Sequence, residues 1–240
     1  MSEWWEDMFA SAGWQQVQLG WDSAEDADDQ ADRIVRALRL EPSMRVLDVP
    51  CGTGRIASRL AARGCDVVGV DITDRFLEVA LARGDGVRYE EADMRELPFE
   101  AEFDAALCFW GSFGYFDEDG NLAQASAVAR ALRPGGRFLI DVPALESILA
   151  RFGERDWFEV EGTVVLEERS FAIATGRTET TWTFLRGGER TERRSSMHLY
   201  SVKDLTDLLT EAGFTSFEAL DDGLEPFELG SDRLWLVATR

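Results

Sequence analysis

Residues 45–54 read Arg45-Val46-Leu47-Asp48-Val49-Pro50-Cys51-Gly52-Thr53-Gly54. Their apolar half is typical of a buried strand, which ends at an acid and a Gly-x-Gly loop, and a helical pattern begins at Arg55. Glycines let the backbone turn sharply and let a ligand approach closely, and the next helix begins with free N–H groups. This stretch therefore predicts a strand, a loop for a nucleotide-sized ligand, and a helix.

Strand-like and helix-like patterns alternate on the C-terminal side of this loop. The predicted strands cover residues 45–48, 65–71, 87–93, 103–109 and 137–142. The predicted helices between them cover residues 55–62, 73–82 and 121–132. This alternation predicts an α/β fold, doubly wound, with a mostly parallel sheet and right-handed crossovers.

The pattern changes after Pro143. A short helix over 144–152 is followed by segments rich in Thr, Val and aromatic residues, which predict antiparallel strands over 158–171, 177–186 and 189–199. Gly187-Gly188 is a two-residue hairpin signal. About 40 residues make a poor core alone, so we expect a β insertion and not a separate domain. The chain then predicts a helix over 201–212, with Ser201 as its N-cap, and a final strand pair over 214–220 and 233–239.

The N-terminal segment is rich in tryptophan. Four of the eight tryptophans precede the first predicted core strand. Acidic residues within 22–32 open a helix that ends before Glu41-Pro42. We expect residues 1–43 to form a helical cap that packs on the main domain. A second, compatible interpretation is that this cap also closes over the ligand as a lid. The predicted organisation is this cap, a ligand-binding core over 44–143, the β insertion over 144–200 above an acceptor pocket, and the end of the core over 201–240.

The composition excludes several classes of partner. The 240 residues carry 46 acids against 25 bases, a net charge of -21, which disfavours nucleic acid and anionic membranes. Three cysteines within or beside predicted strands indicate reduced thiols and the cytoplasm. The acidic, Trp-rich N-terminus is unlike a signal peptide, and no apolar run approaches the roughly 20 residues that span a bilayer. With one histidine and no cysteine cluster, we expect no metal site.

Four stretches together resemble the class I S-adenosylmethionine (SAM)-dependent methyltransferases, and the resemblance covers roughly residues 33–240. They are Val46-Leu47-Asp48-Val49-Pro50-Cys51-Gly52-Thr53-Gly54, Val67-Val68-Gly69-Val70-Asp71, Glu91-Ala92-Asp93-Met94 and Leu132-Arg133-Pro134-Gly135-Gly136. The resemblance implies a seven-stranded sheet of order 3-2-1-4-5-7-6 with strand 7 antiparallel. It also implies SAM as cofactor, S-adenosylhomocysteine (SAH) as product, and methyl transfer as the reaction.

The resemblance also implies how SAM is held. Asp48 lies near the ammonium of the amino acid end, which Gly52 and Gly54 allow to approach the backbone. Asp71 accepts both ribose hydroxyls, and Asp93 accepts from the adenine amine. Ile72 and Met94 sandwich the adenine, and Pro50, Cys51 and Phe109 belong to the same site. Pro50 departs from the family, which commonly has glycine there, so this loop is stiffer and lacks one N–H donor.

Two other functions share part of this pattern. Gly52-Thr53-Gly54-Arg55-Ile56-Ala57 fits the G-x-G-x-x-A motif of a nicotinamide dinucleotide enzyme, with Asp71 near where a ribose-binding acid belongs. Asp48 and Asp93 at two further strand ends argue against that NAD-dependent oxidoreductase. The other alternative is a non-catalytic SAM-binding sensor or partner subunit. Calorimetry with SAM, SAH and NAD distinguishes a methyltransferase from the NAD-dependent oxidoreductase. Turnover of an acceptor distinguishes it from the non-catalytic SAM-binding protein.

The sequence also indicates a small-molecule acceptor. Family members that methylate nucleic acid or protein usually carry Asn/Asp-Pro-Pro-aromatic after the fourth strand, whereas this chain has Phe109-Trp110-Gly111-Ser112. We expect transfer to an O or N atom in a dry aromatic pocket, by a monomer or homodimer. The single histidine, His198, is the candidate general base. The candidate pocket residues are Trp5, Trp14, Trp110, Phe113, Tyr115, Trp157, Trp182, Arg194 and Tyr200.

Overall fold

The structure is a computed structural model that describes residues 3–24 and 27–240. The described residues form two compact units. The larger unit contains residues 27–150 and 200–240, and the smaller unit contains residues 3–24 and 151–199. The predicted 1–43 cap is therefore divided: its first part belongs with the β insertion, and the helix that follows packs on the main sheet.

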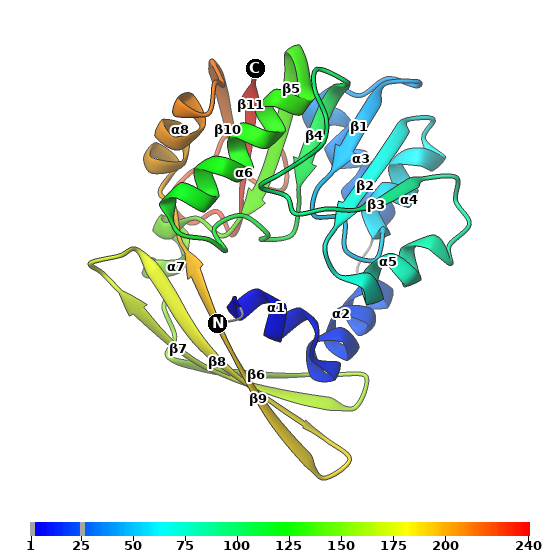
Figure 1. Ribbon diagram of the computed structural model, residues 1–240. Coiled ribbons are helices and arrows are strands. Elements are labelled where there is room, and N and C mark those ends of the chain that lie inside the picture. Colours follow the sequence, from blue (N-terminus) through cyan, green and yellow to red (C-terminus); the bar gives the residue numbers. More distant parts are fainter. Residues whose placement is uncertain (1–2, 25–26) are drawn as a thin grey trace. The chain divides into compact units, whose positions relative to one another are not determined.

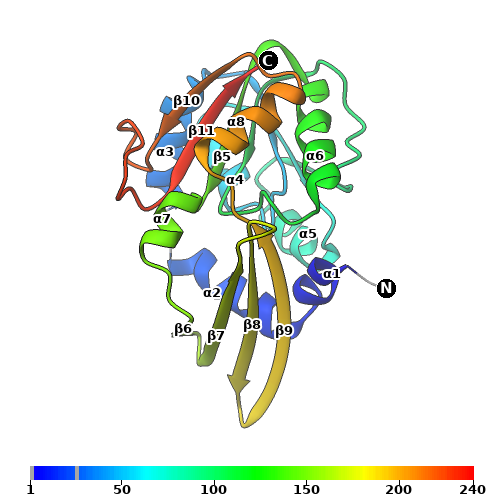
Figure 2. The ribbon, with the colours of Figure 1, turned by 90° about the vertical axis from the view of Figure 1, so that its left-hand side faces the viewer.

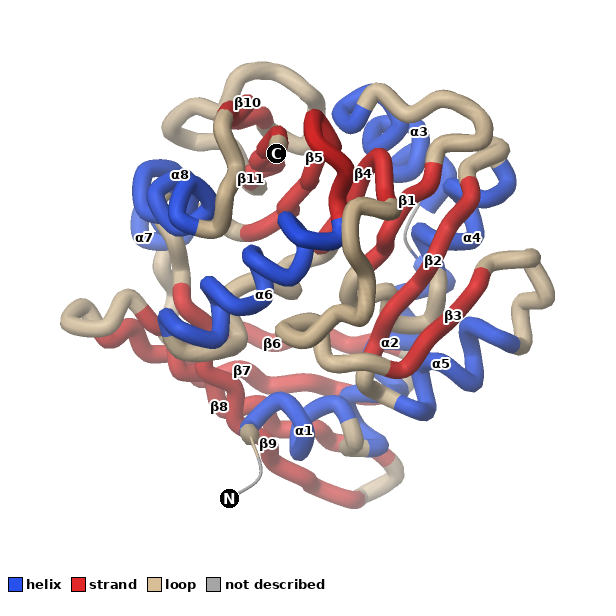
Figure 3. Tube along the Cα trace, turned by 45° about the horizontal axis from the view of Figure 1, so that its top comes forward, coloured by secondary structure: helices blue, strands red, loops and turns tan. Residues whose placement is uncertain are grey.

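The larger unit is built on a seven-stranded sheet in the order β10-β11-β5-β4-β1-β2-β3, which confirms the predicted topology. All neighbours pair in parallel except β11, which is antiparallel to both β5 and β10. Figure 3 shows β3, β2, β1, β4 and β5 side by side. The strands are β1 (Arg45–Asp48), β2 (Asp66–Asp71), β3 (Arg88–Glu91), β4 (Phe103–Cys108), β5 (Leu132–Val142), β10 (Ser216–Leu220) and β11 (Leu234–Thr239).

Helices cover both faces of this sheet. Figures 1 and 2 show α3 on the opposite side of the sheet from α6 and α8. The helix α4 packs on α3 and β2, and α5 contacts β2 and β3. The helices of this unit are α3 (Ala27–Leu38), α4 (Arg55–Ala62), α5 (Asp74–Leu81), α6 (Glu118–Ala131), α7 (Leu145–Ala150) and α8 (Val202–Glu211). The predicted acidic start of α3 includes residues 25 and 26, which lie outside the described residues.

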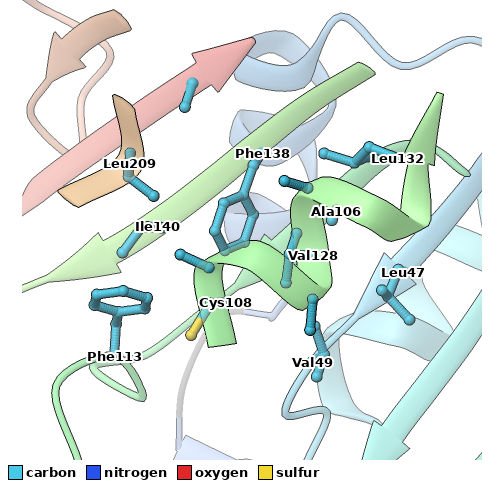
Figure 4. Close-up of a cluster of buried hydrophobic side chains, with 14 of the residues drawn as sticks. Leu47, Val49, Ala106, Cys108, Phe113, Val128, Leu132, Phe138, Ile140 and Leu209 are labelled. Atoms are coloured by element: carbon cyan, nitrogen blue, oxygen red, sulfur yellow. The ribbon is translucent and has the colours of Figure 1, made fainter. Parts of the chain in front are cut away.

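Each face of the sheet has its own apolar core. One core joins α3 and α4 to the sheet through Ile34, Leu60 and Val46. The other joins α6 and α8 to the opposite side of the same strands. Figure 4 shows part of this second core, where Val128 and Leu209 lie against Phe138 and Ile140, all fully buried. Strands buried on both faces explain why the sequence of β4 is almost wholly apolar.

Several local predictions are confirmed. The α4 helix begins at Arg55 and ends at Ala62 as predicted. The Ser201 hydroxyl accepts a hydrogen bond from the Asp204 backbone N–H at 3.1 Å and so caps α8. Phe103 pairs with Leu132 but Ala105 pairs with Arg137, so residues 133–136 loop out of the ladder between the predicted helix over 121–132 and the predicted strand over 137–142.

The smaller unit contains a four-stranded antiparallel sheet in the order β6-β7-β8-β9. Its strands are β6 (Arg155–Val160), β7 (Thr163–Ala172), β8 (Arg177–Arg186) and β9 (Glu189–His198). The predicted hairpin at Gly187-Gly188 is confirmed, because Arg186 pairs with Glu189 across it. The predicted single strand over 158–171 is wrong, since Val160 pairs with Thr163 across a tight turn. Glu161 and Gly162 have φ of 48° and 73°. Positive φ at both central residues is typical of the two-residue hairpin turn whose twist fits that of the flanking strands. Gly162 was the only sign of this turn in the sequence.

The helices α1 (Trp4–Phe9) and α2 (Ala12–Ala24) belong to this smaller unit. They contact β9, β6 and β7. Their aromatic side chains supply much of the unit's core, in which the Trp14 ring meets the Trp182 ring edge-on at 5.3 Å and Trp21 stacks on Phe158 at 5.2 Å. The N-terminal tryptophans therefore have a structural task within this unit. The lid motion stays a prediction.

Phe184→Ala is expected to lower the free energy of unfolding of the smaller unit by about 3–5 kcal/mol. Phe184 is 3% exposed and packs in the α1–α2–sheet core, close enough to α2 that a Cβ at Gly13 would lie 2.7 Å from its ring. Urea denaturation followed by tryptophan fluorescence measures the loss. The control is Trp157→Ala, because Trp157 is 65% exposed and its removal leaves no buried cavity. Equal losses in the two variants would contradict the assignment of this core.

Within residues 3–24 and 27–240, none of the helices combines the length and the apolar character needed to cross a bilayer.

Candidate active site

The glycine loop follows β1 in the larger unit. Gly52 and Gly54 have φ of 54° and 75°, a left-handed conformation that glycine adopts without strain. The Cys51 N–H donates to the Val70 carbonyl at 2.8 Å and ties the loop to β2. The Val49–Pro50 peptide is cis. The loop is therefore fixed between the ends of two adjacent strands, where ligands bind in an open α/β sheet.

Asp71, the last residue of β2, holds this loop with its carboxylate. One oxygen accepts the Gly52 N–H at 2.8 Å, and the other accepts the Thr73 N–H at 2.9 Å. The side chain is buried, and burial raises the pKa of Asp71 even though these N–H groups oppose the shift. A carboxylate that accepts from the loop on one side keeps further lone pairs for a ligand.

Asp48, the last residue of β1, is the most strongly perturbed carboxyl of the loop. It is 2% exposed, and burial, with repulsion from Asp71, raises its pKa from 3.8 to about 8. The guanidinium of Arg55 opposes this shift. A buried carboxyl that lacks enough positive charge is stabilised by a cationic ligand.

Asp93 follows the short strand β3 and is held differently. Arg95 donates to it from its backbone N–H at 2.8 Å and from its guanidinium Nη2 at 2.6 Å. Burial opposes ionisation, but these hydrogen bonds outweigh it and lower the pKa of Asp93. The Arg95 guanidinium also lies 4.3 Å from the centre of the Phe116 ring. Asp93 is thus a fixed, ionised acceptor, as recognition of an amine requires.

The other predicted cofactor residues lie in the same unit. Ile72 is 40% exposed beside Asp71, and Met94 is half-buried beside Asp93, so both present apolar surface next to a carboxylate. Cys51 and Phe109 are buried, and burial raises the pKa of the Cys51 thiol well above its ordinary value. Cys51 therefore stays a neutral thiol and does not serve as a nucleophile.

Tyr89 is a residue of this site that the sequence reasoning missed. Its ring packs across the glycines: a Cβ at Gly69 would lie 2.7 Å from the ring, and a Cβ at Gly54 would lie 2.3 Å from the hydroxyl. The hydroxyl donates to Asp85 at 3.0 Å. Burial, reinforced by Asp85, raises the pKa of Tyr89, so it stays protonated. The sign of this role is that Tyr89 lies opposite the small residue Gly69 on the neighbouring strand. That pairing is known only once the register of the two strands is known.

The residues of the loop fit SAM. A Cβ at Gly52 would meet nothing within 4 Å, so the loop has open space on one side. Asp48 needs positive charge, which the ammonium of the amino acid end supplies. Asp71 offers carboxylate oxygens suited to a diol, and Asp93 offers an acceptor suited to an amine. Among the described residues, no group of three or more His, Cys, Asp or Glu side chains is placed to hold a metal ion.

Only some of the predicted acceptor residues in the larger unit are accessible. Phe113 and Tyr200 are 1% and 5% exposed and pack on each other in the core, where the Tyr200 hydroxyl accepts from Asn121 at 3.0 Å. Trp110 and Tyr115 are half-buried. These two therefore remain as candidate acceptor contacts, whereas the first two have structural partners.

The predicted acceptor residues of the smaller unit lie on opposite faces of its sheet. Trp182 faces α1 and α2, where its Nε1 donates to Ser195 at 2.8 Å and its ring meets Trp14. Trp5 is buried on α1. Side chains alternate along a strand, so the other face carries a second group, formed by Trp157, Arg194 and His198. The structure does not bring these two groups together in one pocket.

Gly52→Ala is expected to weaken SAM binding roughly 10-fold or more, because a methyl group would occupy the open side of the loop. Its cost in stability is about 1–2 kcal/mol, from the left-handed φ of 54°. Gly84→Ala is the matched control, since Gly84 has φ of 62° and equal open space but follows α5. Calorimetry and thermal unfolding of both variants give the comparison. Equal SAM affinities in the two variants would show that the ligand does not approach Gly52.

The chain is similar to known methyltransferases in sequence and structure. Residues 46–136 match a family model described as "Methyltransferase domain". The chain is 29% identical over 210 residues to "Putative methyltransferase GWCH70_2453" of Geobacillus sp. (strain WCH70), across 82% of this chain and 84% of the relative. It superposes on a SAM-dependent methyltransferase of Clostridium acetobutylicum with a TM-score of 0.77 and 21% identity, across 90% and 93% of the two chains.

A second solved structure contains the cofactor. It is CalS10, an amino pentose methyltransferase of Micromonospora echinaspora solved with SAM bound, with 25% identity and a TM-score of 0.66 across 90% of each chain. The matched family model begins at β1 and includes the glycine loop, Asp71 and Asp93. The sheet order, the three carboxylates and these similarities agree: the chain carries a methyltransferase domain, has the fold of SAM-dependent methyltransferases, and is an enzyme with SAM as its cofactor.

Proposed function

We propose that this enzyme transfers the methyl group of SAM to an O or N atom of a small molecule. The observation that carries the proposal is the segment after β4. It reads Phe109-Trp110-Gly111-Ser112, with no Pro-Pro pair, and its first ring packs edge-on against Trp235 at 5.4 Å. The net charge of -21 also disfavours nucleic acid as the substrate. CalS10, which is similar over most of the chain, is described as acting on an amino pentose.

The residues of this chain supply binding, alignment and dryness. SAM carries its methyl group on a positively charged sulfur. This sulfur is a good leaving group because it departs as the neutral thioether SAH, so the reaction needs no metal and little general acid–base catalysis. Asp48, Asp71 and Asp93 hold three separate parts of the cofactor and so fix its orientation. The apolar surfaces of Ile72 and Met94 and the ring of Trp110 exclude water from the neighbourhood of the cofactor.

Tyr115 is suited to donate a hydrogen bond and not to accept a proton. Its hydroxyl donates to the Ser112 Oγ at 3.3 Å. Burial raises the pKa of Tyr115 beyond the working range of an enzyme. We propose that it orients the polar atom of the acceptor. An acceptor that must lose a proton early, such as a phenol, then requires a base from elsewhere.

We further propose that the face of the smaller sheet that carries Trp182 contributes to acceptor binding. This face holds Trp14 and Trp182 in an aromatic cluster, whereas Trp157 and Arg194 on the other face are exposed. A dry aromatic surface suits an apolar ring or, by cation–π contact, an amine. His198 lies on the opposite face of the same sheet, so it remains our candidate base only for a hydroxyl acceptor that binds on that face.

Incubation of the enzyme with methyl-labelled SAM and a pool of metabolites tests the function. Label is expected in small amines or hydroxyl compounds, with equimolar SAH. Tight SAM binding without transfer to any compound would favour the non-catalytic alternative, and label in nucleic acid or protein would overturn the proposal. Once an acceptor is known, Trp182→Ala should raise its KM if it binds at the Trp182 face. His198→Ala should lower kcat only if the acceptor binds on the opposite face and carries a proton that must leave early.

A cytoplasmic location is our inference from the cysteines. Cys51, Cys65 and Cys108 are buried and free. Unpaired thiols are typical of a reducing compartment.

A further inference from the structure

An ion pair between a buried aspartate and a partly exposed arginine joins β5 to the residue that precedes β11 in the larger unit. Asp141 is 1% exposed, and Arg233 donates to its two carboxylate oxygens, from Nε at 2.5 Å and from Nη2 at 2.9 Å. Such a pair is a poor source of stability, because desolvation offsets much of its attraction. Its geometry is bidentate and therefore fixes both side chains. This points to a task in positioning.

The same aspartate holds the segment that follows β4. Its Oδ2 accepts the backbone N–H of Trp110 at 2.8 Å. Its own carbonyl accepts the N–H of Gly111 at 2.9 Å. Two successive residues of the segment after β4 are thus bound to one residue of β5, and the Arg233 pair keeps the carboxylate aimed at Trp110.

Trp110 needs this support because its backbone is left-handed. Its φ is 68°, a conformation that a bulky aromatic residue adopts only under constraint. Gly111, with φ of 78°, adopts a similar conformation freely. The unfavourable conformation at Trp110 sets the direction in which its side chain leaves the backbone.

The ring of Trp110 meets the guanidinium of Arg55, which lies 5.4 Å from the ring centre. Arg55 is the first residue of α4, directly after Gly54, and it is 6% exposed. Its Nη1 donates to the Gln30 Oε1 at 2.6 Å. The charge of Arg55 acts on Asp48, the carboxyl at the end of β1. A continuous set of contacts therefore runs from the ion pair to the glycine loop.

We propose that Asp141, held by Arg233, is a positioning residue that keeps Trp110 left-handed, and that Trp110 and Arg55 form a wall of the SAM site beside Asp48. The proposal rests on SAM binding at the glycine loop. It predicts that Asp141 affects the cofactor only through the conformation of residue 110.

A double-mutant cycle on SAH affinity tests this, with SAH in place of SAM so that no turnover occurs. Asp141→Asn is expected to weaken SAH binding about 10-fold, because the amide loses the Arg233 pair. Trp110→Gly removes the ring but adopts the left-handed backbone without help. In the Trp110→Gly background, Asp141→Asn is therefore expected to change SAH affinity less than about 2-fold.

Equal effects of Asp141→Asn in both backgrounds would overturn the proposal, and so would unchanged SAH affinity in the folded single variant. Where Asp141→Asn fails to fold, the pair Trp110→Ala and Trp110→Gly replaces it. Both lack the ring and should bind SAH more weakly than the parent, and the glycine variant should unfold at a higher temperature, because alanine keeps the strained φ. A glycine variant no more stable than the alanine variant would equally count against the proposal. If the parent protein itself binds no SAH, the proposed function is overturned, and this inference falls with it; the outcomes above overturn the inference alone.

Discussion

Asp71→Ala is expected to weaken SAM binding about 100-fold, equivalent to about 3 kcal/mol. The Asp71 carboxylate has two roles, and its replacement by alanine removes both. The carboxylate receives the Gly52 and Thr73 N–H groups and so shapes the loop. We propose that it also presents acceptor oxygens to the ribose. Removal leaves the Gly52 N–H without its acceptor as well as the ligand hydroxyls without theirs. Calorimetry with SAM and SAH measures the loss.

Asp66→Ala is the matched control for this prediction. Asp66 begins the same strand, β2, but is exposed, and its ion pair with Arg45 at 3.2 Å is solvent-screened. We expect its SAM affinity to equal that of the parent. Parent-like affinity in Asp71→Ala would refute the assignment of the ribose site. Asp71→Asn should be nearly as defective as the alanine variant, because an amide nitrogen would face an N–H donor.

SAM affinity is expected to rise with pH up to about 8, by about tenfold per pH unit at the steepest, and to level off above it. Burial and repulsion from Asp71 raise the pKa of Asp48 to about 8, against the attraction of Arg55, so the carboxyl is protonated in the free enzyme at neutral pH. The cationic end of SAM favours the ionised carboxyl, so binding at neutral pH releases a proton. Calorimetry in buffers of different ionisation enthalpy counts the protons released.

The same shift sets the direction of stability with pH. The pKa of Asp48 is raised in the folded protein from its ordinary value of 3.8 to about 8. Between these values the folded protein keeps a proton that the unfolded chain has lost, so the stability contributed by Asp48 is largest at low pH and falls as pH rises through the window. Above pH 8, Asp48→Asn should be more stable than the parent without ligand.

Asp48→Asn should also bind SAM weakly, with an affinity that no longer depends on pH in this window. Asp66→Asn removes one exposed carboxylate and should keep the parent's pH dependence. A parent affinity that does not change between pH 6 and pH 9 would contradict the protonated state of Asp48. Asp71 is buried beside it, so the two carboxyls titrate as a coupled pair, and Asp71→Asn should shift the dependence to lower pH.

Much of the larger unit was predictable because its determinants are local. The helix at Arg55–Ala62 follows from glycines that end a strand and from apolar residues at helical spacing. Asp48 and Asp71 lie at strand ends, and parallel strands place such ends at one edge of a sheet. These relations need no knowledge of side-chain packing.

The acceptor residues were less predictable because their exposure depends on packing. Phe113 and Trp110 are aromatic neighbours in one segment, yet Phe113 is 1% exposed and Trp110 is half-buried. The missed turn at Glu161-Gly162 shifts the start of the insertion by a whole strand. Trp182 and His198 were expected in one pocket, but strand alternation places them on opposite faces.

The sequence by itself determined the alternation of strands and helices, the glycine loop and the acids at the strand ends, because these lie in consecutive residues, and the sheet order followed from the family resemblance that these stretches carry. Only the tertiary structure placed Tyr89 against Gly54, Arg95 on Asp93, and Asp141 beneath Trp110. In two of these three cases the partners come from different strands or loops. The contacts of Tyr89 and of Asp141 form because the sheet register and the burial of charge bring together residues that are distant in the sequence. No pattern of neighbouring residues predicts such contacts.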